Sequence, residues 1–106
     1  MTHNRINLGA TLLALCALLG SCPAIAQSDM AQARSLAATC SNCHGTNGVA
    51  TVGMVPLAGY NKADLVKNMS DFKSGTRPAT IMHQLSKGYS ESQIEAIASY
   101  FAAQKK

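Results

Sequence analysis

One motif constrains this chain more than any other, the Cys-x-x-Cys-His sequence at residues 40–44. In a helical turn, residues three and four positions apart share one face, so the thiols of Cys40 and Cys43 and the imidazole of His44 would project together. This spacing is typical of covalent haem attachment. We therefore predict one haem c, bound through thioethers from Cys40 and Cys43, with His44 as the proximal ligand of the iron.

Two other uses of these cysteines fit the rest of the sequence less well. A zinc ribbon needs a second Cys-x-x-Cys, or two histidines about 12 to 15 residues further on, and the sequence has neither. His83 could complete a zinc site only by coming from a distant segment. A thioredoxin-type redox pair would lie near a strand-helix-strand pattern, which the sequence lacks.

The first 26 residues have the form of a secretory signal peptide. A polar head with Arg5 precedes the uncharged apolar run 8–19, which is shorter than the ~20 residues needed to cross a bilayer. Ala24-Ile25-Ala26 then matches a cleavage site. We predict an exported, periplasmic protein whose single mature domain is residues 27–106.

A second export signal overlaps the first. Leu19-Gly20-Ser21-Cys22 resembles a bacterial lipobox, in which Cys22 would be lipidated and become the mature N-terminus. Glycine at the second position makes this match weaker, and the Ala-x-Ala site follows shortly after. We expect cleavage without lipidation, with a membrane anchor at Cys22 as the alternative.

The cysteine count leaves no disulfide framework. Of the four cysteines, Cys16 lies in the apolar leader and Cys22 precedes the favoured cleavage site, so only the two of the motif remain. The mature domain is small and has no Trp, two Phe and three Tyr, which gives a marginal core. A buried haem would supply the missing apolar volume.

The formal net charge of +4 is modest. The lysines are dispersed and are not interleaved with aromatic residues, which argues against nucleic-acid binding. A mildly positive face instead suits docking to an acidic protein partner.

Apolar periodicity predicts a single all-α domain without repeats or strand pairs. The expected helices cover residues 29–39, 62–73 and 91–103, with a short helix over 79–85. Ser28 and Asn61 would cap the first two, and Ser90 with Gln93 has capping-box spacing for the last. The first helix should pack across the last, through Met30, Ala33, Leu36, Ala37 and Cys40 on one side and Ile94, Ile97, Ala98 and Phe101 on the other.

Residues 45–59 lack a helical period and are rich in glycine, which predicts a loop wrapped over the haem edge.

The iron also needs a ligand opposite His44, and its identity decides between electron transfer and ligand chemistry. Met82 is favoured, because a chain could fold back over the distal face just before the last helix. Met69 belongs to an apolar stripe with Leu65 and is more compatible with the core. The full candidate set is Met30, Met54, Met69, Met82 and His83.

Residues 40–44, the Pro56-Leu57-Ala58-Gly59 loop, Met82 and the closing helix together resemble a class I c-type cytochrome, over nearly all of residues 27–106. More narrowly, residues 72–85 and 87–90 are similar to the cytochrome subunit of flavocytochrome c sulfide dehydrogenase. The resemblance implies terminal helices that cross over a covalently bound haem, with Met82 as the axial methionine. It also implies the Pro56 carbonyl as acceptor for the second ring N–H of His44; the alternative is that Pro56 only ends the loop.

The resemblance implies an electron carrier rather than an enzyme, receiving electrons from an FAD-containing subunit that oxidises sulfide. Some members carry two haem domains, whereas this chain has a single motif and thus one haem. A free shuttle to a terminal oxidase or reductase is the first alternative. A haem enzyme or gas sensor with an open distal site is the second, and it lacks a distal Arg and His pair of catalytic form.

Overall fold

The computed structural model describes residues 24–106, which form helices and connecting loops without a strand. The predicted all-α class is therefore confirmed for this part of the chain. Most of the predicted signal peptide, and Cys22 with it, lies outside the described residues. In chain order the elements are α2 (Ala24–Ala37), η1 (Ala38–Cys40), α3 (Ser41–His44), η2 (Thr46–Gly48), α4 (Lys62–Ser74), α5 (Met82–Leu85), η3 (Ser86–Gly88) and α6 (Glu91–Ala102).

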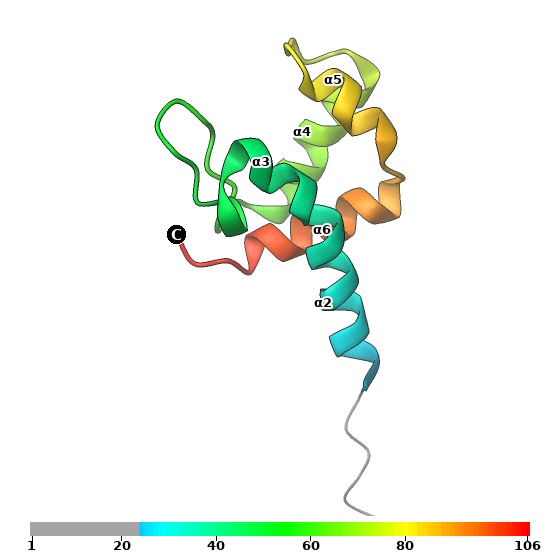
Figure 1. The fold of residues 1–106 in the computed structure, drawn as a ribbon. Helices are drawn as coiled ribbons and strands as arrows, with labels where there is room; N and C mark the ends of the chain where they lie inside the picture. The colour runs from blue at the N-terminus through cyan, green and yellow to red at the C-terminus, as the bar shows by residue number, and fades with distance from the viewer. Residues whose placement is uncertain (1–23) are drawn as a thin grey trace, which may run out of the picture.

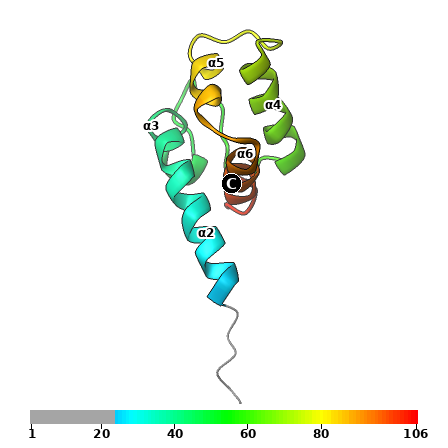
Figure 2. The ribbon, with the colours of Figure 1, turned by 90° about the vertical axis from the view of Figure 1, so that its right-hand side faces the viewer.

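The core lies where α2 crosses α6 (Figures 1 and 2). Ala33 and Ala37 of α2 are buried, and their small side chains let α6 approach closely. Leu65 and Met69 of α4 are also buried in this cluster, which confirms the interpretation of Met69 as a core residue. The predicted stripe of α6 is confirmed as well, since it is buried throughout: Ile94, Ile97, Ala98 and Phe101.

The prediction that Met30 belongs to the inner face of the first helix is wrong, because this side chain is 44% exposed. The N-terminal half of α2 projects beyond the crossing with α6, so no other helix of residues 24–106 covers it (Figures 1 and 2). The start of the helix also differs: α2 begins at Ala24, and Ser28 lies inside it rather than at its cap. The preceding Ala-Ile-Ala-Gln sequence is rich in helix-forming residues, which allows the helix to begin earlier.

The caps predicted for the second and last helices are confirmed, and these helices end within one residue of the predicted positions, at Ser74 and Ala102. The short helix predicted over 79–85 covers only Met82–Leu85. Asn61 accepts a hydrogen bond from the Asp64 backbone N–H at the start of α4, and Gly75 ends this helix with a left-handed backbone. Ser90 and Gln93 form the predicted capping box of α6, with each side chain bonded to the other residue's backbone N–H.

The large side chain at the centre of the core gives a stability prediction. Phe101 is fully buried against α2 and α4, so Phe101→Ala should leave a cavity and lower the free energy of unfolding by about 3–5 kcal/mol. Urea unfolding followed by far-ultraviolet circular dichroism measures this loss. The exposed neighbour Ala102 is a matched control, because Ala102→Ser should change stability by less than about 0.5 kcal/mol. Equal, small effects for the two variants would contradict the assigned core.

Candidate haem-binding site

The backbone holds the Cys-x-x-Cys-His motif in a helical turn, as its spacing predicts. The helical path of α2 continues through η1 into α3, with right-handed helical dihedral angles at Ala37, Cys40 and Ser41. Cys40 ends η1, while Cys43 and His44 belong to α3. One helical turn therefore carries both thiols and the imidazole.

The two thiols lie in different environments. Cys40 is half-buried and packs against the core cluster, whereas Cys43 is exposed, and both are free cysteines. Burial raises the pKa of the Cys40 thiol, against the opposing effect of a hydrogen bond with Thr39.

His44 is oriented by a hydrogen bond to the loop that follows it. Its Nδ1 lies 2.7 Å from the backbone oxygen of Val55. A carbonyl can only accept, so Nδ1 carries the proton, and the lone pair of Nε2 is left free for a metal. This is the arrangement in which a metal-ligating histidine is usually held.

The acceptor is Val55 and not Pro56, so the structure corrects the Pro56 prediction by one residue. The backbone N–H groups of Leu57 and Ala58 both donate to the Gly48 carbonyl, at 2.9 and 3.0 Å. The chain immediately after Pro56 is thereby held against η2, which leaves the preceding carbonyl facing His44.

The predicted loop over residues 45–59 contains the short 3-10 helix η2, and only the part after Gly48 is non-helical as predicted. The two bonds to Gly48 close this part at its base. Gly48 has a φ of 79°, and a Cβ at this position would lie 2.6 Å from the Ala58 backbone nitrogen. Only glycine permits this approach. At the other end, Gly59 N–H donates to the Phe101 carbonyl at 2.9 Å, which fastens the loop to α6.

Met82 begins α5, and its half-buried side chain packs against the same core cluster as Cys40. Both views place α3 and α5 on the same side of the α2–α6 crossing (Figures 1 and 2). The fold thus packs the late methionine and the first cysteine of the motif against the same core cluster. Its role as the axial ligand remains a prediction.

The other candidate ligands are distributed differently. Met69 is buried in the core, and Met30 and Met54 are 44% and 42% exposed. His83 is half-buried, next to Met82, with an Nδ1 that is buried and has no hydrogen-bond partner.

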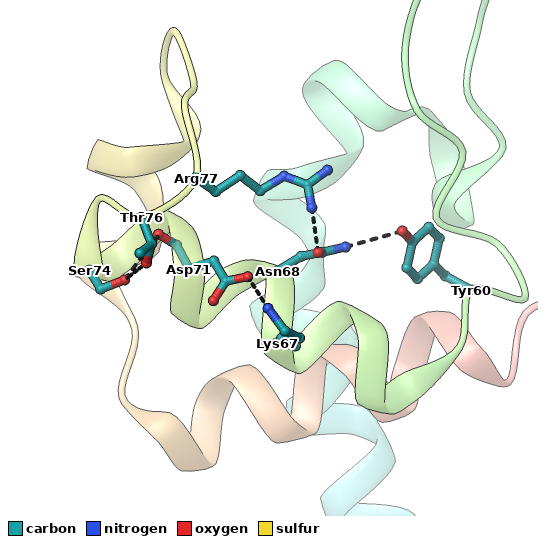
Figure 3. A network of polar contacts seen from close by, with 7 residues as sticks. All are labelled: Tyr60, Lys67, Asn68, Asp71, Ser74, Thr76 and Arg77. Atoms are coloured by element: carbon teal, nitrogen blue, oxygen red, sulfur yellow. Dashed lines mark hydrogen bonds and ion pairs between the residues drawn. The ribbon is translucent and has the colours of Figure 1, made fainter.

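Several polar contacts near Met82 were not anticipated from the sequence. Figure 3 shows Arg77 reaching from the loop after α4 to Asn68, which in turn bonds to Tyr60. The hydroxyls of Thr39 and Tyr89 also lie 2.6 Å apart. This contact joins η1 to the residue that precedes the N-cap of α6. No motif spacing signals these contacts, because their partners are far apart in the sequence.

The side chains present fit a covalently bound haem by the chemistry of their donors. Two free thiols and an imidazole with a fixed tautomer share one turn, and the Met82 thioether packs against the same core cluster as Cys40. Within residues 24–106, no three His, Cys, Asp or Glu side chains gather as a conventional metal site. Every helix in that range is too short or too polar to span a bilayer.

Comparison with known proteins gives consistent relatives, although no protein-family model matches the chain. The cytochrome subunit of sulfide dehydrogenase from Chlorobaculum tepidum is 32% identical over 79 residues, which cover 74% of this chain and 72% of the relative. Cytochrome c4 from Pseudomonas aeruginosa is 39% identical over 81 residues, covering 76% of this chain and 40% of the relative.

Among solved structures, a cytochrome c4 of Acidithiobacillus ferrooxidans superposes with a TM-score of 0.61 and 26% identity. The match covers 69% of this chain and 50% of that one. This chain therefore spans half or less of the cytochrome c4 chains it matches, and most of the sulfide dehydrogenase subunit.

Proposed function

This chain belongs to the class I c-type cytochromes, electron-transfer proteins with covalently bound haem c, and from that premise we propose that it is a monohaem periplasmic carrier which accepts electrons from an FAD-containing sulfide dehydrogenase subunit. The single Cys-x-x-Cys-His motif supports one haem per chain. The likeness to a cytochrome subunit of sulfide dehydrogenase, over 72% of that relative, supports the donor.

The site residues have distinct roles in this proposal. Cys40 and Cys43 would attach the haem through thioethers, and His44 and Met82 would hold its iron. When bound, haem c supplies reversible one-electron chemistry between Fe(III) and Fe(II). With a residue on each side of the iron, no position is left for a substrate.

The observation that carries the proposed site is the 2.7 Å hydrogen bond between His44 Nδ1 and the Val55 carbonyl. It fixes the tautomer, prevents the ring from rotating and makes Nε2 a better electron donor. A thioether from Met82 opposite His44 would favour the reduced state, as His/Met ligation does in cytochromes c. The chain would therefore act as an acceptor of moderately high potential.

Exposed apolar side chains support docking of another protein near this site. Val52 and Val55 belong to the loop, and Ile81 and Leu85 flank Met82, and all four are at least 49% exposed. Surfaces of this kind, close to a redox centre, favour brief contact with a partner.

Stopped-flow absorption spectroscopy tests the donor. Ferric protein is mixed with sulfide, alone and with increasing amounts of the FAD-containing subunit. We expect the rate of haem reduction to rise with the flavoprotein concentration, and a heat-denatured flavoprotein is the control. Reduction that is equally fast without the flavoprotein would reject this donor. In that case fast oxidation by a terminal oxidase or reductase would favour a free shuttle.

The mature N-terminus tests the export proposal. Intact-mass measurement should give a chain that begins at Gln27 and carries one haem. A lipidated Cys22 would instead place the carrier on the membrane surface.

A further inference from the structure

Two cationic side chains connect α4 to the segment that carries Met82. One contact lies before the methionine in the sequence, and the other involves a residue after it. Before it, Arg77 Nη1 donates to Asn68 Oδ1 at 2.5 Å (Figure 3). The guanidinium carbon also lies 5.1 Å from the centre of the Phe72 ring. The Arg77 backbone N–H also donates to the Asp71 carbonyl at 3.1 Å. The chain leading to Met82 is thus fixed to the last turns of α4.

After the methionine, Lys73 forms the second connection. Its Nζ donates to the Tyr89 carbonyl at 2.7 Å and to Glu91 Oε1 at 2.9 Å. The Lys73 side chain is 30% exposed, so its contact with the carbonyl is partly shielded from water. Lys73 and Arg77 therefore fix both ends of the intervening segment, residues 78–88, to one helix.

Between these two contacts, the segment is attached to the rest of the protein mainly through the buried Ser86 and the half-buried Met82. α5 is only four residues long, too short to be a stable helix by itself. Residues 78–81 are exposed, and Leu85 is 49% exposed. A short helix attached at a few points opens more readily than the helices of the core.

We propose that Lys73 and Arg77 are positioning residues that keep the Met82 segment closed over the iron, so that they determine how readily the methionine leaves it. This inference rests on the proposed ligation by Met82. Neither side chain touches the reacting centre. Each acts by lowering the population of an otherwise folded state in which Met82 has moved away.

Urea titration of the ferric holoprotein tests the inference, with two signals recorded in parallel. The weak near-infrared band of methionine-ligated ferric haem reports ligation, and far-ultraviolet circular dichroism reports the helices. In Lys73→Gln, and separately in Arg77→Gln, the band should disappear at a lower urea concentration than the helices. The equilibrium constant for local opening should rise about tenfold, as expected for loss of a hydrogen bond to a charged group.

Lys67 provides the matched control, because it is also a lysine of α4 in an ion pair, with Asp71 at 2.5 Å, and this pair lies within α4. In Lys67→Gln the two signals should stay together, as in the wild type. Lys73→Arg keeps a cationic donor and should restore the wild-type behaviour. A role of Lys73 in general stability alone would shift both signals equally.

The outcomes separate this inference from the proposed function. A wild-type protein without the near-infrared band overturns ligation by Met82, and the positioning role with it. A wild-type protein with the band, in which Lys73→Gln and Arg77→Gln behave like Lys67→Gln, overturns the positioning role alone. If one of the two variants fails to fold, the other still gives the test, because the two side chains have different partners. Arg77 contacts Asn68 and Phe72 of α4. Lys73 bonds to Tyr89 and Glu91.

Discussion

Met82→Ala is expected to retain covalently bound haem and to expose the distal side of the iron. The ferric variant should lose the near-infrared methionine band, and the ferrous variant should bind carbon monoxide within seconds, whereas the wild type should not. The reduction potential should fall by on the order of 100 mV, because the thioether that favours the reduced state is replaced by water or by nothing. Absorption spectra and a spectroelectrochemical titration measure these changes.

Three control variants decide whether Met82 has been chosen correctly. Met54→Leu changes an exposed loop residue, Met69→Leu changes a core residue, and His83→Gln removes the neighbouring imidazole whose Nδ1 has no partner. All three should keep the band and should not bind carbon monoxide rapidly. Loss of the band in Met54→Leu, or a spectrum of bis-histidine type in the wild type that disappears in His83→Gln, would reassign the distal ligand.

The double variant Cys40→Ser/Cys43→Ser is expected to contain no covalent haem. After expression with haem-attachment machinery, its band on a denaturing gel should give no haem stain, and its intact mass should equal that of the polypeptide alone. Any haem it retains should be extracted by acidified acetone, because His44 and Met82 supply only coordinate bonds. Ser41→Ala, within the same turn, should behave as the wild type.

The single cysteine variants should differ in stability. Cys40 packs against the core cluster and Cys43 is exposed, so a serine hydroxyl at position 40 is partly buried and one at position 43 is solvated. Cys40→Ser should therefore lower the free energy of unfolding more than Cys43→Ser, by about 1–2 kcal/mol. Covalent haem in the double variant would refute attachment through these thiols, and equal stabilities for the single variants would refute the packing assigned to Cys40.

Several predictions that depend on interactions within one helical turn are confirmed, although the cap predicted at Ser28 is not. The helical spacing of the motif needs only one turn of backbone, and the caps at Asn61 and Ser90 involve residues three positions apart. The buried stripe of α6 follows from a period of 3.6 residues. The sequence pattern failed at Met30, because whether a helix face is covered depends on where its neighbour ends.

The resemblance carried the prediction to the right family and fold, and comparison with relatives and a solved structure supports both. It placed the histidine's acceptor at Pro56, whereas the structure has Val55. Which carbonyl faces His44 depends on how Gly48, Leu57 and Ala58 close the loop. A motif of a few residues does not determine which carbonyl of the loop faces His44.

By itself, the sequence determined the chemistry of the site: two thiols and an imidazole on one helical turn, with a small set of sulfur and nitrogen ligands elsewhere in the chain. Only the tertiary structure decided that Met82 shares a core surface with Cys40, that Val55 orients His44, and that Lys73 and Arg77 fix the Met82 segment to α4. The physical reason is the range of the interactions. Spacing within one turn is set by backbone geometry, whereas contacts between distant segments depend on how the packed helices and the loops between them are arranged in space.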